Sequence, residues 1–215
     1  EKELAVQKLN FQSLQMQVKP HFYLNAFNII YSMAEVKDFK TIQKLTMAMV
    51  EYSRYMFSDS DKLVMLREEL RHVQNYIEIQ KIRFLGMIEY TEDVAEEYKN
   101  VMLPPFVLQG FVENSIKYGL KSKQLNHLQI HAEVFRKYYL KITVRDDGPG
   151  FDEERMEMMN REVTDIRQIE NHVGIYNAKG RLLHIFGNRA KVKLHNDQGA
   201  VVDIYIPYIR TEEEK

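Results

Sequence analysis

The stretch HLQIHAEVFRKYYLKITVRDDGPGF, residues 127–151, contains two segments, HLQIHAEVF and YYLKITVRDDG, that are rich in β-branched and aromatic residues. Both are typical of β-strands. The second one ends in an Asp-x-Gly-x-Gly pattern formed by Asp146, Gly148 and Gly150. Paired glycines let the backbone adopt positive φ and approach a ligand closely, and a carboxylate at a strand end can accept a hydrogen bond from an exocyclic amine. Taken alone, the pattern fits an ordinary Gly-Pro turn equally well.

The segments on either side of this stretch alternate between helix and strand. Before it, LREELRHVQNYIEIQKIRF is helical, MIEYTEDV resembles a strand, and LPPFVLQGFVENSIKYG is a helix whose prolines suit a first turn. After it come a polar segment from Phe151 to about Asn171, the helix NAKGRLLHIF, and the strands AKVKLHN and AVVDIYIP. This order predicts a mixed, mostly antiparallel sheet with helices on one face, an α/β sandwich within the α+β class.

Up to about residue 60 the apolar residues follow the period of helices instead. The two stripes are Phe11, Leu14, Val18, Phe22, Ala26, Ile29 and Met33, and then Ile42, Leu45, Met49, Tyr52 and Met56. Each helix has one apolar stripe that needs covering, so the hairpin is expected to form a four-helix bundle on dimerisation. We therefore expect two domains, a dimerisation hairpin at residues 1–60 and the α/β sandwich at residues 61–215.

Composition limits the function classes. The 215 residues are 45% hydrophobic and 28% charged, enough to bury a core. The 30 basic residues nearly balance the 31 acidic ones and are interleaved with them, which argues against nucleic-acid binding. The chain has no cysteine, so it has no disulfide or thiolate metal site and fits a reducing compartment. It opens on Glu1 in helical register and is expected to be a fragment of a longer protein.

Two further short motifs lie in the second half. VENSIKYG places Asn114 and Lys117 on one helical face, where an amide oxygen suits Mg²⁺ and an ammonium suits phosphate. VGIYNAKGRL places Gly174 before a helix, whose N-terminal amides can cradle phosphates, with Asn177 and Arg181 behind it. Alone, each motif is better explained by ordinary solvated polar residues. Three such motifs in this order, each where an element begins or ends, form a much stronger signal.

In this order, FVENSIKYG, DDGPG and VGIYNAKGRL resemble the N-box and the two glycine boxes of the Bergerat-fold ATPases, the superfamily of gyrase, chaperone, histidine-kinase and MutL proteins. Together with LQMQVKPHFYLNAFN and LREELRHVQNYIEIQKIRF, the chain is similar to the YesM/LytS-like sensor histidine kinases of two-component systems. The resemblance extends from about Leu9 to Pro207, and its most specific part is the P-H-F-x-x-N segment.

The resemblance implies a catalytic core in which His21 is the phosphoacceptor and Mg·ATP the donor. Asn114 would ligate Mg²⁺, Asp146 would contact the adenine, and the segment from Phe151 to Asn171 would be a mobile lid. The residues expected to bind the nucleotide are Asn114, Lys117, Tyr118, Asp146, Gly148, Gly150, Gly174, Asn177 and Arg181. Of these, Lys117 and Tyr118 would lie near the phosphates. Gly174, Asn177 and Arg181 would flank them.

The same resemblance implies the partners. The phosphoryl group would pass from His21 to an aspartate of a separate response regulator, and the active form would be a homodimer. The full protein would be anchored in a bacterial membrane by a sensor preceding Glu1, and the chain would be its cytoplasmic domain.

His21 follows Pro20 in QVKPHFYLNAFNII, and this proline is expected to make a hinge beside the acceptor. A neutral imidazole is an adequate nucleophile toward a γ-phosphoryl group. Many histidine kinases have an acidic residue directly after the acceptor, but here that residue is Phe22, so the base is left open: solvent or the ATP domain. Asn25 stands where relatives keep a Thr or Asn that orients water, which suggests a phosphatase role.

The sequence also departs from the family pattern. His172 replaces the first glycine of the second glycine box, and NDQGAVVDIYIP lacks the usual Thr after its glycine. Two rival functions share the fold. An ATP hydrolase or serine kinase generally keeps a glutamate where this chain has Gly110, and the neighbouring Glu113 points elsewhere on the helix. A degenerate, non-catalytic dimeric scaffold is supported by His172 and opposed by the retention of the other site residues.

Overall fold

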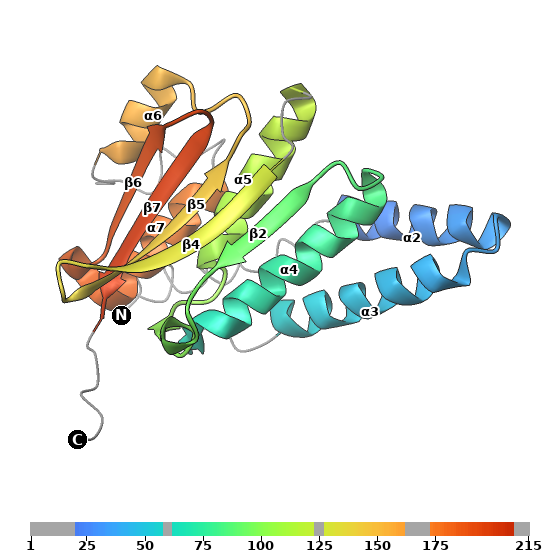
Figure 1. Cartoon of the computed structure of the whole chain (residues 1–215), viewed down its shortest axis with the longest axis horizontal. Helices are drawn as coiled ribbons and strands as arrows, with labels where there is room; N and C mark the ends of the chain where they lie inside the picture. The colour runs from blue at the N-terminus through green and yellow to red at the C-terminus, as the bar shows by residue number, and fades with distance from the viewer. Residues whose placement is uncertain (1–19, 58–61, 123–126, 162–172, 209–215) are drawn as a thin grey trace, which may run out of the picture.

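The computed structural model describes residues 20–57, 62–122, 127–161 and 173–208. A helical hairpin stands at one end of the molecule, and α4 lies between this hairpin and the sheet (Figure 1). The elements of this region are α2 (Pro20–Glu35), α3 (Phe39–Met56), β1 (Val64–Met65) and α4 (Leu66–Arg83). Among the described residues, no helix is both long and apolar enough to cross a membrane.

The hairpin forms as its apolar periods predict. Phe22 and Ala26 of α2 are buried, as are Leu45, Met49 and Tyr52 of α3. The first part of the predicted α2 stripe, and the region before Pro20 where a hinge is expected, lie outside the described residues.

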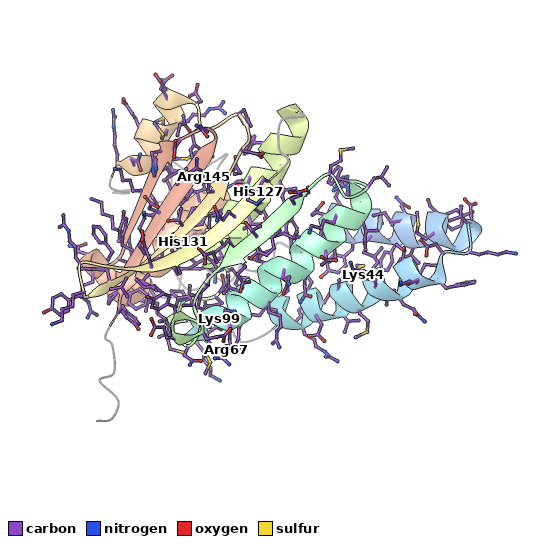
Figure 2. All side chains as sticks on the ribbon, viewed as in Figure 1. Lys44, Arg67, Lys99, His127, His131 and Arg145 are labelled. Carbon is purple, nitrogen blue, oxygen red and sulfur yellow. The ribbon has the colours of Figure 1, made fainter. Side chains whose placement is uncertain are left out.

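An aromatic layer fixes α2 and α3 against α4. The Phe22 ring lies 4.8 Å from that of Tyr52 and stacks at 5.8 Å on that of Tyr76 in α4. Lys44 of α3, labelled in Figure 2, also pairs with Glu78 of α4. The hairpin is therefore packed on the rest of the chain and is not an isolated arm.

The second part is the predicted sandwich. Its strands are β2 (Glu89–Asp93), β4 (His127–Phe135), β5 (Tyr139–Asp146), β6 (Lys191–Asn196) and β7 (Ala200–Pro207), in the spatial order β2-β4-β5-β7-β6. Among the strands of the described residues, only the edge pair β2–β4 is parallel, so the prediction of a mixed, mostly antiparallel sheet is confirmed. The helices are α5 (Val107–Ser122), α6 (Glu153–Asn160) and α7 (Val173–Phe186).

The two faces of the sheet differ. Leu140, Ile142 and Val144 of β5 point to the helices and are buried. The alternate residues point outward, and Figure 2 shows His127, His131 and Arg145 on this outer face. One covered and one solvated face is the arrangement expected for a largely antiparallel sheet.

Three details differ from the sequence-based expectations. A short pair of strands, β1 with β3 (Met102–Leu103), had no signal in the sequence pattern. The prolines before α5 do not form its first turn, because the helix begins at Val107 after a turn in which Phe106 has a φ of 63°. Gly174 lies within the first turn of α7 and not before it. The four-helix bundle belongs to the dimer and stays a prediction, as does the domain boundary at residue 60.

The helices α5 and α7 approach closely at a pair of glycines. A Cβ atom added to Gly110 would lie 2.8 Å from the carbonyl oxygen of Gly174, whereas one added to Gly180, also helical, would meet nothing within 4 Å. A side chain at Gly110 would therefore require α5 and α7 to move apart. That closeness positions both helices at the candidate site.

We expect alanine to have opposite effects at these two glycines. Gly180→Ala should raise the free energy of unfolding by up to about 1 kcal/mol, because alanine favours the helix. Gly110→Ala gains the same propensity but should lower the free energy of unfolding by about 1–3 kcal/mol through overpacking against α7. Urea unfolding followed by circular dichroism measures both changes. Equal effects would contradict a close contact between α5 and α7.

Candidate functional site

A cavity of about 430 Å³ opens between α5, α7 and the ends of β5 and β7. Its walls are largely apolar, and a single buried carboxylate, Asp146, is set among them. Among the residues that line it are Phe111, Asn114, Tyr118, Val144, Asp146, Phe151, Arg155, Met159, Ile175 and Val202. An apolar cavity with a few placed polar groups is the usual form of a small-molecule site.

Asp146 is held at the end of β5 by the backbone around it. Its Oδ1 accepts hydrogen bonds from the amide of Gly148 at 2.9 Å and from that of Ala200 at 3.3 Å. Ala200 occupies the place of the missing Thr, so a backbone amide supplies a donor there. Among the described residues, Oδ2 has no hydrogen-bond partner. One carboxylate oxygen is thus fixed, and the other remains for a donor in the cavity.

Glycine is required at the close approach next to Asp146. At Gly199, which has a φ of 140°, a Cβ atom would lie 1.9 Å from the carbonyl oxygen of Asp146. This contact brings the β6–β7 turn onto the end of β5. It explains why the amide of Ala200 reaches the carboxylate.

The Gly-Pro-Gly loop is held by Asn196 of β6. The Asn196 side chain accepts a hydrogen bond from the Phe151 amide at 2.7 Å and donates one to the Phe151 carbonyl at 2.8 Å. Gly150 has a φ of 77°, and a Cβ atom there would lie 2.8 Å from Oδ1 of Asn196. Asn196 could not be identified from the sequence, because its partner is distant in sequence and only the fold brings the two together.

Asn114, Ser115 and Tyr118 face the cavity from α5. The Nδ2 atom of Asn114 is buried and has no hydrogen-bond partner among the described residues. An unpaired buried amide is costly, so a ligand that pairs with it would be favoured. Amide oxygens are also suitable Mg²⁺ ligands. The buried Nδ2 is a donor, so it would pair with an acceptor such as a phosphate oxygen, while the amide oxygen of the same side chain would be the Mg²⁺ ligand.

Two other residues expected at the nucleotide, Lys117 and Asn177, are not among the residues that line the cavity. Lys117 is exposed, with its ammonium 5.2 Å from the centre of the Tyr118 ring. Asn177 is half-buried on α7. Gly174 packs closely against α5, since a Cβ atom added there would lie 3.5 Å from Nδ2 of Asn114.

Arg181 occupies a place different from the one expected. Its side chain is buried, with Nη1 3.3 Å from the carbonyl oxygen of Pro105 and the guanidinium 5.1 Å from the centre of the Phe106 ring. It therefore holds the turn that precedes α5 and does not line the cavity. The spacing of Asn177 and Arg181 placed them on one helix, but it could not tell which face of that helix points to the cavity.

The start of the expected lid is ordered as α6. Asp152, Arg155 and Met159 from this region line the cavity and were not identified as site residues from the sequence. Buried Lys179 of α7 donates to the carbonyl oxygen of Met159, which fastens α6 to α7. The remainder of the expected lid and His172 lie outside the described residues.

His21 is exposed on α2, while its neighbour Phe22 points into the core. The Nδ2 atom of Asn25, one turn along α2, lies 3.0 Å from Nδ1 of His21. No residue of α2 is among those that line the cavity. The expected acceptor, His21, therefore lies outside the cavity.

The contact between α5 and α7 bears on the hydrolase alternative. Gly110 occupies the place where the hydrolases carry a glutamate, and even a Cβ atom there would collide with Gly174. A glutamate at this position would require α5 and α7 to move apart, so this packing disfavours a water-activating role for this helix.

Two family models cover most of the chain. The model described as histidine kinase matches residues 9–88, and the model described as histidine kinase-, DNA gyrase B- and HSP90-like ATPase matches residues 105–210. The fold agrees with solved histidine kinase structures. One is a mycobacterial sensor histidine kinase, MprB, with a TM-score of 0.50 and 11% identity over 68% of this chain and 96% of that chain. Another is the catalytic domain of the histidine kinase ThkA, with a TM-score of 0.50 and 19% identity over 67% of this chain and 95% of that chain.

The chain belongs to the histidine kinases. Within them it is similar to the LytS sensor proteins. It is 30% identical to Sensor protein LytS of Bacillus cereus over 98% of this chain and 36% of that protein. It is 27% identical to Sensor histidine kinase/phosphatase LytS of Staphylococcus aureus over 94% of this chain and 35% of that protein. The chain thus spans about a third of the length of these relatives.

We expect Asp146→Asn to weaken ATP binding by about tenfold to a hundredfold, the range for losing a hydrogen bond to a charged group. ITP, which has no exocyclic amine at position 6, should bind the wild type more weakly than ATP does, and the variant should lose this discrimination. Isothermal titration measures both affinities.

Asp147→Asn is the matched control for this experiment, because it removes a carboxylate next to Asp146 but outside the cavity lining. Unchanged ATP affinity in Asp146→Asn would rule out a base-contacting role for Asp146.

Proposed function

We propose that the chain is the catalytic core of a sensor histidine kinase, which binds Mg·ATP in the cavity and transfers the γ-phosphoryl group to His21. The observation that carries this proposal is the cavity itself. It combines a buried carboxylate that has one oxygen available with an unpaired buried amide at Asn114. These are two of the polar groups that the family resemblance assigns to adenine and to the magnesium ion.

The cavity suits a purine nucleotide along its length. Val144, Ile175 and Val202 offer apolar contacts for the base next to Asp146. Asn114 would hold Mg²⁺, which when bound neutralises phosphate charge. Arg155, an exposed cation on α6, lines the cavity and would face the phosphates.

The transfer step forms one bond and breaks another. A lone pair on an imidazole nitrogen of His21 attacks the γ-phosphorus, the bond from that phosphorus to the β–γ bridging oxygen breaks, and ADP leaves. The imidazole proton departs to solvent or to a base. Because α2 does not line the cavity, His21 must reach the nucleotide by relative movement of the two parts, or in a second chain.

A second copy of the chain is supported by the hairpin surface. Leu24, Phe27 and Tyr31 form an apolar stripe along α2 on the side away from Phe22, and their exposed fractions are 60%, 58% and 67%. Met47 and Val50 of α3 are exposed as well. An exposed apolar patch on a helical hairpin is the surface that a four-helix bundle would bury. We therefore propose a homodimer through the hairpin.

The other partners follow from the relatives. Their names describe sensor proteins, and this chain covers about a third of their length. We propose that the complete protein has a membrane-anchored sensor before Glu1, that this chain is its cytoplasmic part, and that His21 passes its phosphoryl group to an aspartate of a response regulator. The name of the S. aureus relative includes a phosphatase, which makes the same activity a proposal for this chain.

Incubation with ATP labelled at the γ-phosphate tests the kinase proposal. We expect acid-labile, base-stable label on the wild type and none on His21→Gln. Asp146→Asn should also remain unlabelled at low ATP concentrations, because it binds ATP weakly. Label on His21→Gln would exclude His21 as the acceptor, and an unlabelled wild type that binds no ATP would favour the non-catalytic scaffold.

Asn25 is the residue through which we expect the phosphatase activity to act. Its amide contacts the His21 ring and can orient a water molecule against a docked phospho-aspartate. Asn25→Ala should slow dephosphorylation of the response regulator by about a hundredfold, the lower end expected for losing one positioned group. ATP affinity should stay unchanged. The release of inorganic phosphate from the phosphorylated regulator measures the rate, and Asn28→Ala, on the exposed part of the same helix, is the control.

A further inference from the structure

One buried carboxylate connects the hairpin to the helices of the cavity. Glu69 of α4 is fully buried. Its Oε1 accepts hydrogen bonds from the hydroxyl of Tyr55 in α3 and, at 2.6 Å, from the amide of Phe106. Its Oε2 accepts one from the amide of Leu108 at 2.9 Å. Both oxygens are therefore engaged, and the donors come from two other parts of the fold.

The carboxylate of Glu69, on α4, caps the N-terminus of α5. The first amides of a helix lack partners within it, and a negative charge near them is stabilising. The first turn of α5 has no acidic residue of its own. Phe106, whose φ of 63° is uncommon for a residue other than glycine, is fixed by its bond to Glu69. Glu69 thus caps the start of α5 and fixes the turn that precedes it.

The direction of α5 is what places the cavity residues. Asn114 lies seven residues beyond Val107, about two helical turns, and Tyr118 lies one turn further. A tilt at the first turn is therefore carried to both residues. Arg181 connects the second cavity helix, α7, to the start of α5. Its guanidinium donates to the carbonyl of Pro105 and attracts the Glu69 carboxylate.

The hairpin contacts this point through Tyr55 and Tyr52. The Tyr55 ring stacks on that of His72 at 4.3 Å and meets the Phe106 ring edge-on at 5.2 Å. One turn earlier, the Tyr52 hydroxyl accepts a hydrogen bond from Nε2 of Gln109 at 2.8 Å. Two hydroxyls of α3 are therefore bonded to α5 or to its cap.

Because Glu69 is buried, its carboxylate depends on every hydrogen-bond donor around it. Burial raises the pKa of Glu69, and the bonds from Tyr55, Leu108 and Phe106 and the charge of Arg181 oppose that rise. A carboxylate that loses one of these donors in a dry site is poorly compensated. Displacing α3 would therefore alter the cap that holds α5.

We propose that Glu69 is a positioning residue through which the helical hairpin sets the geometry of the nucleotide site, so that movement of α3 changes the placement of Asn114. This inference rests on the proposed function, since it assigns a regulatory input to the same cavity. The coupling runs in both directions, because a change in hairpin position that alters nucleotide affinity must be matched by an effect of the nucleotide on the hairpin.

Tyr55→Phe is the test, because it keeps the ring contacts and deletes only the hydroxyl that joins α3 to Glu69. Tyr23→Phe is the matched control, since the Tyr23 hydroxyl lies 3.2 Å from Oγ of Ser53 and bonds only within the hairpin. In Tyr55→Phe we expect ATP to bind about fivefold or more weakly, the lower range of measured couplings, and the Leu108 and Phe106 amides to exchange hydrogen faster. In the autophosphorylation assay KM for ATP should rise more than kcat falls.

Glu69→Gln provides a second variant that keeps the size of the side chain and removes its charge. It should speed exchange at the same two amides. Equal ATP affinity and amide exchange in Tyr55→Phe and Tyr23→Phe, or a Glu69→Gln variant that behaves as wild type, would overturn the proposal. A wild type that binds no ATP would refute the proposed function instead, and the amide exchange would still decide the role of Glu69.

Discussion

A carboxylate removed from water must be hydrogen-bonded or paired, and this constraint acts at two places in the chain with different results. Glu69 has both oxygens satisfied by protein donors, so it joins α3, α4 and α5 into one unit with Arg181 of α7 nearby. Asp146 has one oxygen held by backbone amides and the other left for a ligand. The first carboxylate fixes the helices that form the cavity, and the second is a feature of the cavity itself.

The fold could be largely predicted because its main signals are local. Helical periods mark α2, α3 and α4, and β-branched and aromatic runs mark the strands. The features that could not be predicted depend on contacts between segments that are distant in sequence. The β1–β3 pair is two residues long on each side, too short for any period. The turn at Phe106 follows two prolines that suit a first helical turn, but it takes its conformation from Glu69, which lies 37 residues earlier.

Short motifs predicted those parts of the candidate site in which the backbone takes an unusual conformation. Gly148 and Gly150 beside Asp146 indicate a turn that a side chain would obstruct, and the structure contains that turn. Helical spacing was less informative, because it groups residues on one face without saying what that face meets. Arg181 was for this reason assigned to the phosphates and lies against Phe106 instead. Asn196 and Arg155 could not be identified, since only the tertiary fold brings them to the loop and the cavity.

The absence of an acidic residue after His21, the proposed acceptor, has a packing explanation. Successive residues of a helix point about 100° apart, and in α2 His21 is exposed while its neighbour points toward α3 and α4. Phe22 does so, between the rings of Tyr52 and Tyr76. A carboxylate in that aromatic layer would be buried without partners, at a cost that the hairpin could not compensate. The residue that contacts the His21 ring must then come from the next turn, which is where Asn25 lies. An amide holds the ring without contributing charge, so in this hairpin the orientation of the imidazole is separated from the removal of its proton.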